Sequence, residues 1–385
     1  MPPLVSIILP TYNRWRTLPQ AIASVQAQSY PHWELIIVDD GSTDETPRGL
    51  AALAEPRLRC VRQPNQGRSA ARNRGLALAQ GEMVAFLDDD DWYLPSRLAQ
   101  QVAFLQAHAD VDLAAAGVYI ARESESPQAS ESSLHPWVTW RDQPQLTLDR
   151  CLYGCPLPIC AVMLRRDWLE RLSHWFDPEL TLLEDTDFFL RLLLAGARFA
   201  WLEAFVSVYR LHGGSSQQDG GRYARAYLQL LAKLLASPQM PAALRHQEPA
   251  LRTHYLLAAA CHAYAAPDLP LAHALLQQAA AWQPTLAQPG DHTFMQMVVG
   301  FAHSPQVSDP PAYVRRVWRN LPAALTALRS QERQALSLLY MGRVFKARDR
   351  AAAPSLHDWL HALYYDAPRW LFQPAAWSVF WNRST

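Results

Sequence analysis

The chain has 385 residues, half of them hydrophobic, which is more than one compact domain usually holds and enough for two. Its 35 basic and 35 acidic residues cancel, but they are unevenly distributed along the chain. Residues 1–221 hold 19 basic and 27 acidic residues (net −8), and residues 222–385 hold 16 basic and 8 acidic residues (net +8). The acidic N-terminal part argues against nucleic acid as a partner, and the basic C-terminal part indicates an anionic partner such as a membrane face.

The cysteines and the hydropathy indicate a cytoplasmic protein. Five cysteines are an odd number and suggest no disulfide framework, which fits a reducing compartment. The N-terminus lacks the basic head of a secretory signal, and no run reaches the ~18 apolar residues of a membrane span. We therefore expect any membrane contact to be peripheral.

The front half alternates strand and helix patterns. Expected strands, rich in β-branched residues, are Val5–Leu9, Leu35–Val38, Leu58–Val61 and Met83–Leu87. Expected helices are Leu18–Gln28, a short one capped by Asp44, and Ser69–Gln80. Repeated β–α units with continuous apolar strands predict a mostly parallel sheet covered by helices on both faces.

Three of these strands run directly into polar clusters. The clusters are Thr11–Asn13, Asp39–Ser42 and Asp88–Asp91. Ligands of such sheets bind beyond the carboxyl ends of the strands, so we expect the clusters to meet at one rim.

The remaining pattern predicts a mainly helical second domain. Residues 123–144 indicate a loop beside the site, Ile159–Leu164 a strand, and Leu183–Ala195 a helix. The pattern changes near Gly221, so we predict domains 1–221 and 222–385, the second with helices Tyr223–Leu235, Pro249–Ala266, Pro270–Ala281 and Leu321–Leu339. The aromatic tail from Trp359 to Trp381 fits either an interfacial anchor or a helix pair packed on the core.

Four consecutive carboxylates at Asp88–Asp91 are the strongest chemical signal. Their mutual repulsion is costly unless a cation neutralises it, and hard oxygen ligands favour Mg²⁺ or Mn²⁺, which suit a diphosphate. A solvated acidic turn before the next helix is the alternative, but the buried strand ahead of it favours a metal site.

Six stretches in order resemble family 2 glycosyltransferases of the GT-A fold over residues 4–215. They begin at Ser6 (SIILPTYN), Val38 (VDDGSTD), Asn65 (NQGRSAARNRG), Phe86 (FLDDDD), Glu184 (EDTDFFLR) and Tyr209 (YRLHGGS). The resemblance implies an inverting enzyme that uses a nucleotide diphosphate sugar with Mn²⁺ or Mg²⁺, and a saccharide or lipid-linked acceptor. The donor it implies is most commonly a UDP-sugar, with dTDP- and GDP-sugars as alternatives.

The resemblance also supplies site roles. Asp88 and Asp90 match the two acids of the DxD motif, with Asp90 on the metal and Asp88 on the ribose or, through water, the metal. The residues implied around the nucleotide are Pro10, Thr11, Tyr12, Asp39, Arg72, Asp88, Asp89 and Arg210. Asp40 is expected to order the Gly41–Ser42 turn, and His212 to reach the metal or the diphosphate. A helix-surface arginine is the alternative for Arg72, and a solvated loop residue for His212.

Glu184 and Asp185 are the expected source of a general base. An acceptor hydroxyl must lose its proton as it attacks, and a positioned carboxylate accepts it. The helix dipole is expected to keep such a carboxylate ionised. The family match favours Asp185 as base and Glu184 as support, with Asp187 structural, while a capping role for one acid remains an alternative.

Other functions fit the residues less well. A nucleotidyltransferase usually has a Gly-rich phosphate loop after the first strand, where this chain has Pro10–Arg14 without glycine. A non-catalytic nucleotide-sugar-binding protein of the same fold is hard to reconcile with the intact acids. Cys151, Cys155 and Cys160 lack a C-x₂-C pair, so we expect buried thiols rather than zinc ligands.

Overall fold

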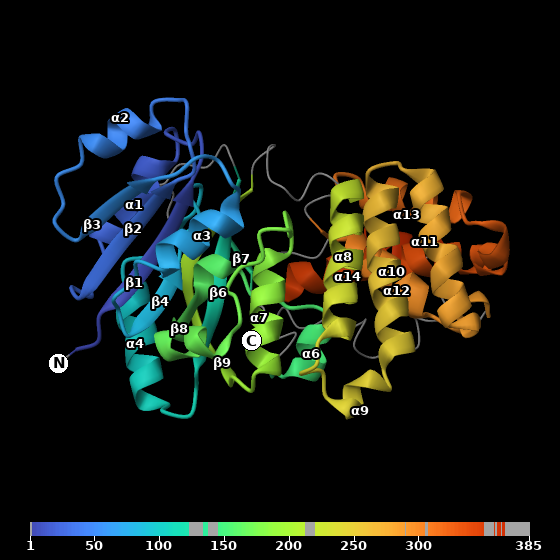
Figure 1. Ribbon diagram of the computed structural model, residues 1–385. Helices are drawn as coiled ribbons and strands as arrows, with labels where there is room; N and C mark the ends of the chain where they lie inside the picture. The colour runs from blue at the N-terminus through green and yellow to red at the C-terminus, as the bar shows by residue number, and fades with distance from the viewer. Residues whose placement is uncertain are drawn as a thin grey trace, which may run out of the picture. The chain divides into compact units, whose positions relative to one another are not determined.

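A computed structural model of the chain describes residues 2–122, 134–137, 145–211, 220–288, 290–304, 307–349, 358, 360–362 and 364–365. The chain divides into two compact units (Figure 1). The first comprises Met1–Ser215 and Ala236–Leu244, and the second Ser216–Leu235 and Arg245–Thr385. The boundary expected at Gly221 falls within helix α8 (Gly220–Ala236).

The first unit is built on one nine-stranded sheet, whose order is β3-β2-β1-β4-β8-β6-β9-β5, with β7 paired to β6. The strands are β1 (Val5–Thr11), β2 (Trp33–Asp39), β3 (Leu58–Arg62), β4 (Met83–Phe86), β5 (Trp92–Tyr93), β6 (Leu113–Arg122), β7 (His135–Trp137), β8 (Val162–Arg165) and β9 (Phe199–Leu211). Its helices are α1 (Leu18–Gln26), α2 (Thr46–Ala51), α3 (Arg68–Leu76), α4 (Arg97–Ala107), α6 (Leu148–Leu152) and α7 (Glu184–Leu194), with 3₁₀ turns at Ile159–Ala161 and Arg166–Arg171.

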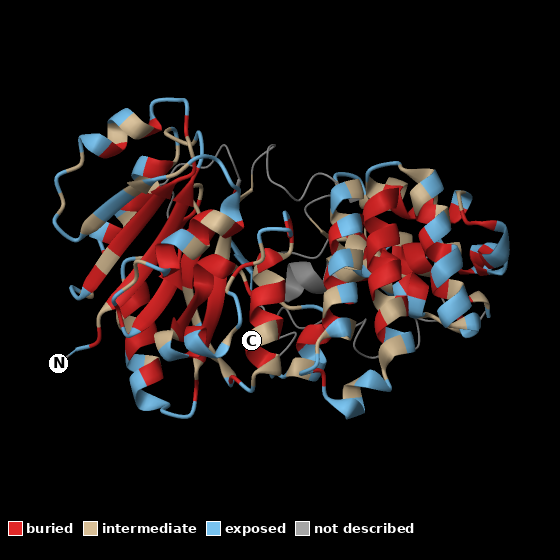
Figure 2. Cartoon of the chain, viewed as in Figure 1, coloured by how far each residue is buried: buried red, intermediate tan, exposed pale blue. Residues whose placement is uncertain are grey.

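Strands β3, β2, β1 and β4 are mutually parallel, as predicted. Every second residue of β1 and β2 packs into one hydrophobic core with the apolar sides of α1 and α4, so these two helices cover one face of the sheet. Helix α3 covers the other face, because a Cβ at Gly75 would lie 2.5 Å from Ile8 Cγ2 of β1. Glycine at this position therefore allows α3 to approach the sheet closely. Figure 2 shows β1, β2 and β4 as almost wholly buried, whereas the edge strand β3 is exposed or partly exposed.

The other half of the sheet is mixed rather than parallel. β8 runs antiparallel to both β4 and β6, and β6 runs parallel to β9. The predicted strand from Ile159 begins only at Val162, after a 3₁₀ turn. Within the segment expected to be a loop, residues 135–137 form β7, and residues 123–133 and 138–144 lie outside the described residues.

The second unit is helical, as expected. Its elements are α8, α10 (Glu248–Ala265), α11 (Leu269–Trp282), α12 (Thr293–Ala302), α13 (Pro310–Arg319) and α14 (Glu332–Asp349), with 3₁₀ segments at Pro284–Ala287 and Ala323–Gln331. The short helix α9 (Ala242–Arg245) belongs to the first unit except for Arg245. The helix expected from Leu321 is wrong over its first half, since Ala323–Gln331 is 3₁₀ and α-helix begins at Glu332. One buried cluster joins α8 and α10–α14.

None of the helices in the described ranges is both long and apolar enough to span a bilayer. The aromatic tail falls almost entirely outside the described residues, so its interpretation stays a prediction.

Candidate active site

The polar clusters meet at one rim of the sheet, as the strand directions predict. Thr11 at the end of β1 pairs with Asp39 at the end of β2. The Leu87 amide donates to the Ile8 carbonyl at 3.0 Å, so Asp88 leaves the sheet beside the same strand end. Acids from two strands thus face a common edge.

Asp39 orders the turn that follows β2. Its Oδ1 accepts a 2.8 Å hydrogen bond from the Ser42 amide. Its Oδ2 is buried and has no hydrogen-bond partner among the described residues, although Arg62 Nε lies 3.4 Å away. Oδ2 of the buried Asp39 carboxylate can therefore still accept a hydrogen bond from an N–H or O–H group of a ligand.

Asp40, expected to order that turn, instead holds the loop before α3. Its Oδ1 accepts from Gln63 Nε2 at 2.8 Å and from the Gln66 amide at 2.9 Å, and its Oδ2 accepts from the Gly67 amide at 2.8 Å. The expectation was wrong because adjacent acids at a strand end point to opposite sides, and spacing alone does not say which side each takes.

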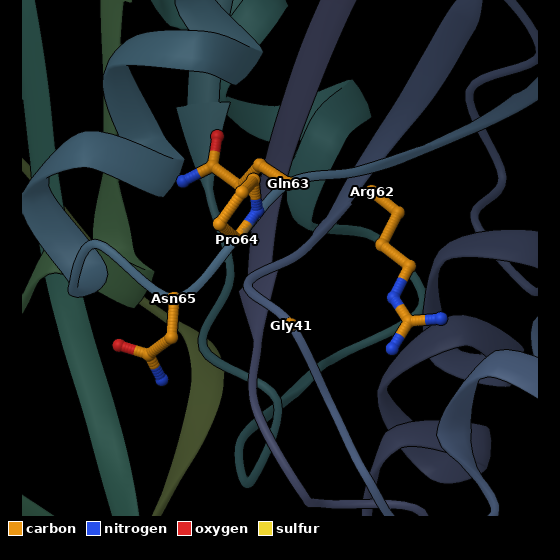
Figure 3. A pocket seen from close by; sticks show the side chains of 5 residues that line it. All are labelled: Gly41, Arg62, Gln63, Pro64 and Asn65. Atoms are coloured by element: carbon orange, nitrogen blue, oxygen red, sulfur yellow. The ribbon is translucent and has the colours of Figure 1, made fainter.

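A pocket of about 460 Å³ includes Arg62, the ion-pair partner of Asp39, in its lining (Figure 3). It is lined by Gly41, Arg62, Gln63, Pro64 and Asn65. Gly41 has φ 83°, and a Cβ there would lie 2.8 Å from the Asn65 amide nitrogen, so a side chain would not fit. The pocket offers amide groups, an apolar proline ring and one guanidinium.

The loop after β1 presents an aromatic ring at this rim. Pro10 and Thr11 are buried in β1. Tyr12 is 45% exposed, and its amide lies 3.3 Å from Asp89 Oδ2. The ring is thus accessible for stacking, while its backbone contacts the acid cluster.

Arg72 is fully buried between two acids, so the helix-surface interpretation is wrong. Its Nη2 donates to Asp88 Oδ1 at 2.6 Å and its Nη1 to Glu184 Oε1 at 2.8 Å. The side chain is 1% exposed. Although burial raises the pKa of Asp88, Arg72 and then Arg68 hold it below its usual value. Arg72 therefore connects the DxD acid to the start of α7.

Aromatic packing fixes the start of α7 near the end of β4. Phe188 of α7 stacks on Phe176 at 4.5 Å and meets the edge of Phe86 of β4 at 6.1 Å. The helix begins after Leu183, which has φ 60° and supplies no side-chain cap. A left-handed leucine is a strained conformation of the kind that collects at functional sites.

Asp185 follows Glu184 in the first turn. Its Oδ1 accepts from the adjacent Thr186 amide at 2.7 Å, whereas Glu184 is 4% exposed and paired to arginine. Burial, and then the charge of Glu184, raise the pKa of Asp185 to about 6, with Arg72 opposing. The shift is upward, contrary to the expected effect of the helix dipole, yet leaves the carboxylate ionised at neutral pH. Leu183, not an acid, occupies the N-cap position.

The two acids that flank Asp90 both have raised pKa values. Burial, and then the charge of Asp90, raise the pKa of Asp89 to about 7 and also raise that of Asp91. The Arg210 amide donates to Asp91 Oδ1 at 2.9 Å and its Nε to the Asp90 carbonyl at 2.9 Å. Arg210 thus orders the acidic loop, and its guanidinium also lies over Trp92, 4.9 Å from the ring centre.

The acid cluster fits a divalent cation that takes most of its ligands from substrate and water. No three His, Cys, Asp or Glu side chains converge as a ligand set within the described ranges. Asp90 is about one-fifth exposed and lies 3.9 Å from Arg14. Mg²⁺-type sites commonly use one or two carboxylates plus phosphate oxygens. His212 lies outside the described residues, so its part in such a site stays a prediction.

Sequence reasoning missed two arginines at the site, Arg62 and Arg68. Arg62 ends β3 and pairs with Asp39. Arg68 lies 3.4 Å from Glu184. Arg68 precedes Arg72 by four positions, so both project from one side of α3, and that spacing was the available signal. Nothing in the sequence near Arg62 indicates its partner.

The remaining expected roles concern Asp187 and the cysteines. Asp187 is buried and bonds Arg191 Nε at 2.8 Å, as its structural assignment requires. All five cysteines are free, and Cys151 and Cys160 are buried as expected, with Cys155 partly buried.

Comparisons with known proteins identify relatives of this chain. Residues 6–173 match the family described as Glycosyl transferase family 2. The chain is 31% identical over 219 residues to WcaA of Escherichia coli (strain K12), named as a colanic acid biosynthesis glycosyl transferase, covering 56% of this chain and 75% of that one. It is 27% identical over 213 residues to the Escherichia coli UDP-Glc:alpha-D-GlcNAc-diphosphoundecaprenol beta-1,3-glucosyltransferase WfaP, covering 55% and 79%.

A solved structure supports the fold. The mannosyltransferase PcManGT from Pyrobaculum calidifontis, in complex with GDP-Man and Mn²⁺, superposes with a TM-score of 0.53 at 21% identity over 86% of this chain and 87% of that one. The expected GT-A fold with a helical C-terminal region is thereby confirmed. With this fold, the family match and the extent of the similarity to WcaA, the chain belongs to glycosyltransferase family 2.

Proposed function

We propose that the chain transfers a sugar from a nucleotide diphosphate sugar, a UDP-sugar first among them, to a saccharide or lipid-linked acceptor with inversion at the anomeric carbon. The observation that carries this proposal is the Arg72 guanidinium, which bonds Asp88 on one side and Glu184 on the other. It joins the donor-side acids to the segment that bears Asp185, the one acid here suited to accept an acceptor proton.

The Asp39 environment supports a base that carries an N–H group beside a carbonyl. Asp39 Oδ2 accepts, and the Arg62 guanidinium, held by its bond to the Ser42 carbonyl at 2.7 Å, donates. Uracil and thymine present that edge through their imino N–H and a flanking carbonyl, and guanine presents it through N1–H and O6, whereas cytosine and adenine present an amino group and a ring acceptor instead. Tyr12 supplies a ring on which a base stacks.

In the proposed mechanism Asp185 accepts the proton of the acceptor hydroxyl as its oxygen bonds to the anomeric carbon. The bond from that carbon to the diphosphate oxygen breaks, and its electron pair leaves with the nucleotide diphosphate. Single displacement converts an α-linked donor into a β-linked product. Asp90, with Asp88 and His212, would hold Mn²⁺ or Mg²⁺, which when bound supplies positive charge to the leaving diphosphate.

The acceptor and its location are also part of the proposal. The name of WfaP specifies a UDP-Glc donor, a diphosphoundecaprenol-linked acceptor and a β-1,3 product. A lipid-linked acceptor of that class would bring the reaction to the cytoplasmic face of a membrane. The +8 charge of residues 222–385 supports peripheral contact between the helical domain and an anionic surface.

The metal assignment has a direct test in Asp90→Ala. We expect the variant to lose Mn²⁺-dependent binding of UDP in calorimetry while its melting temperature stays close to that of the unaltered protein. Glu179→Gln, which changes an exposed acid, is the control. Unchanged Mn²⁺-assisted affinity in Asp90→Ala would show that the cation binds elsewhere.

A further inference from the structure

The arginine expected beside the nucleotide has little capacity left for a ligand. Both terminal nitrogens of Arg72 bond carboxylates, at 2.6 and 2.8 Å, and the side chain is 1% exposed. A guanidinium so placed fixes Asp88 and Glu184 relative to one another. A substrate anion would have to displace one of two short, buried ion pairs to reach it.

Arg68 is placed differently on the same side of α3. The one hydrogen bond or ion pair of its side chain in the described part of the chain runs from Nη1 to Glu184 Oε1 at 3.4 Å, the oxygen that Arg72 already bonds at 2.8 Å. The side chain is 49% exposed. A guanidinium has five N–H donors, so most of those on Arg68 are available to a ligand.

Arg68 also interacts electrostatically with the acids of the site. Although burial lowers the pKa of Arg68, the negative charges of Glu184, Asp88, Asp90 and Asp185 together raise it above its usual value, so it is a permanent cation. It therefore lies within electrostatic reach of both the acid expected on the metal and the acid expected to take the acceptor proton. In the proposed reaction, the bond that breaks lies between those two groups.

We propose that Arg68 is a catalytic residue whose guanidinium binds the distal phosphate of the donor's diphosphate and stabilises it as it leaves. This assignment rests on the proposed function. As the bond from the anomeric carbon to the diphosphate oxygen breaks, that oxygen takes the electron pair and the diphosphate gains one negative charge. Charge-assisted hydrogen bonds from Arg68 strengthen as that charge develops, which lowers the barrier rather than only tightening binding.

The test measures what the second phosphate contributes to binding. Affinities of UDP and UMP are determined by calorimetry with the full chain in saturating Mn²⁺, for the unaltered protein, Arg68→Gln and Arg68→Lys. We expect Arg68→Gln to weaken UDP binding by about 10-fold, the scale of a lost hydrogen bond to a charged group, and to leave UMP binding nearly unchanged. Arg68→Lys keeps the charge and should keep part of the difference between UDP and UMP.

Arg74→Gln is the matched control, because Arg74 is an exposed arginine on the same helix. It should change neither affinity. Turnover at saturating donor should fall in Arg68→Gln by about 10-fold or more and stay constant in Arg74→Gln. Equal loss of UDP and UMP affinity in Arg68→Gln, or no loss of either, overturns the assignment. If the unaltered protein itself shows no Mn²⁺-dependent preference for UDP over UMP, the proposed function fails instead.

Discussion

Asp185 combines the properties that a general base needs at neutral pH. Burial, and then the charge of Glu184, raise its pKa to about 6, and one of its oxygens is fixed by the Thr186 amide. A base is most effective when its pKa lies near the working pH, because it is then ionised and still a strong proton acceptor. Glu184 forms ion pairs with Arg68 and Arg72 through its Oε1, so this carboxylate is already engaged within the protein.

The pH dependence of turnover should report this carboxylate. Asp185 acts only when deprotonated, so kcat should fall as the pH drops through about 6 and reach a plateau above it. Asp185→Asn should remove that acid limb and lower kcat by ~10²-fold or more. UDP affinity should change little, since Asp39, Asp88 and Asp90 hold the nucleotide in the proposed site.

Thermal stability separates this role from a structural one. The folded-state pKa of Asp185 is raised, so its ionisation at neutral pH opposes folding, and the isosteric amide should raise the melting temperature rather than lower it. Glu179→Gln is the control for removing one acidic charge. Turnover in Asp185→Asn close to that of the unaltered protein would pass the role of base to Glu184.

At the scale of elements, the sequence predicts the parts whose signals are local. Strands β1, β2 and β4 are continuous apolar runs, and their directions alone bring Asp39 and Asp88 to one rim. Strand β6 was missed because its run of three alanines at 114–116 has low strand propensity, and these small side chains are buried between β8 and β9. The bond from Arg72 to Glu184 spans 112 positions, and no local pattern encodes such a contact.

The loop that leads into α3 provides an element-scale prediction. Asp40 accepts three hydrogen bonds there, two of them from backbone amides. Asp40→Ala leaves those donors unsatisfied and should lower the free energy of unfolding by about 3 kcal/mol in urea denaturation. Asp110→Ala removes an acid that is 68% exposed and should change it little. Equal stability of the two variants would mean that water replaces Asp40 without cost.

On the scale of the whole molecule, the charge is divided along the chain. The first 221 residues carry −8 and the rest +8. Acidic side chains in the first unit gather where a cation and a diphosphate are expected. The helical unit has its own buried core and carries the excess of arginine, so its charge is available for a separate task. Fields of this kind act through long-range attraction and weaken with salt.

Membrane association of the full chain should follow that division. We expect it to pellet with anionic vesicles at low salt, and to be released at high salt or with uncharged vesicles. Neutralising three exposed arginines of the helical unit (Arg319, Arg329 and Arg333 to Gln) should reduce pelleting. Neutralising three exposed arginines of the first unit (Arg59, Arg74 and Arg171 to Gln) should not. Equal pelleting of both triple variants would assign the contact to another surface.

The division of the chain at α8 also affects how the protein is made. Residues Ala236–Leu244 belong to the first unit, although Ser216–Leu235, which precede them, belong to the second. On the ribosome, the catalytic unit therefore cannot be complete when Ser215 emerges. It must wait until a helix of the other unit and nine further residues have been synthesised. Domains generally fold as units during synthesis, so folding of the first unit has to include a segment that is made after a helix of the second unit.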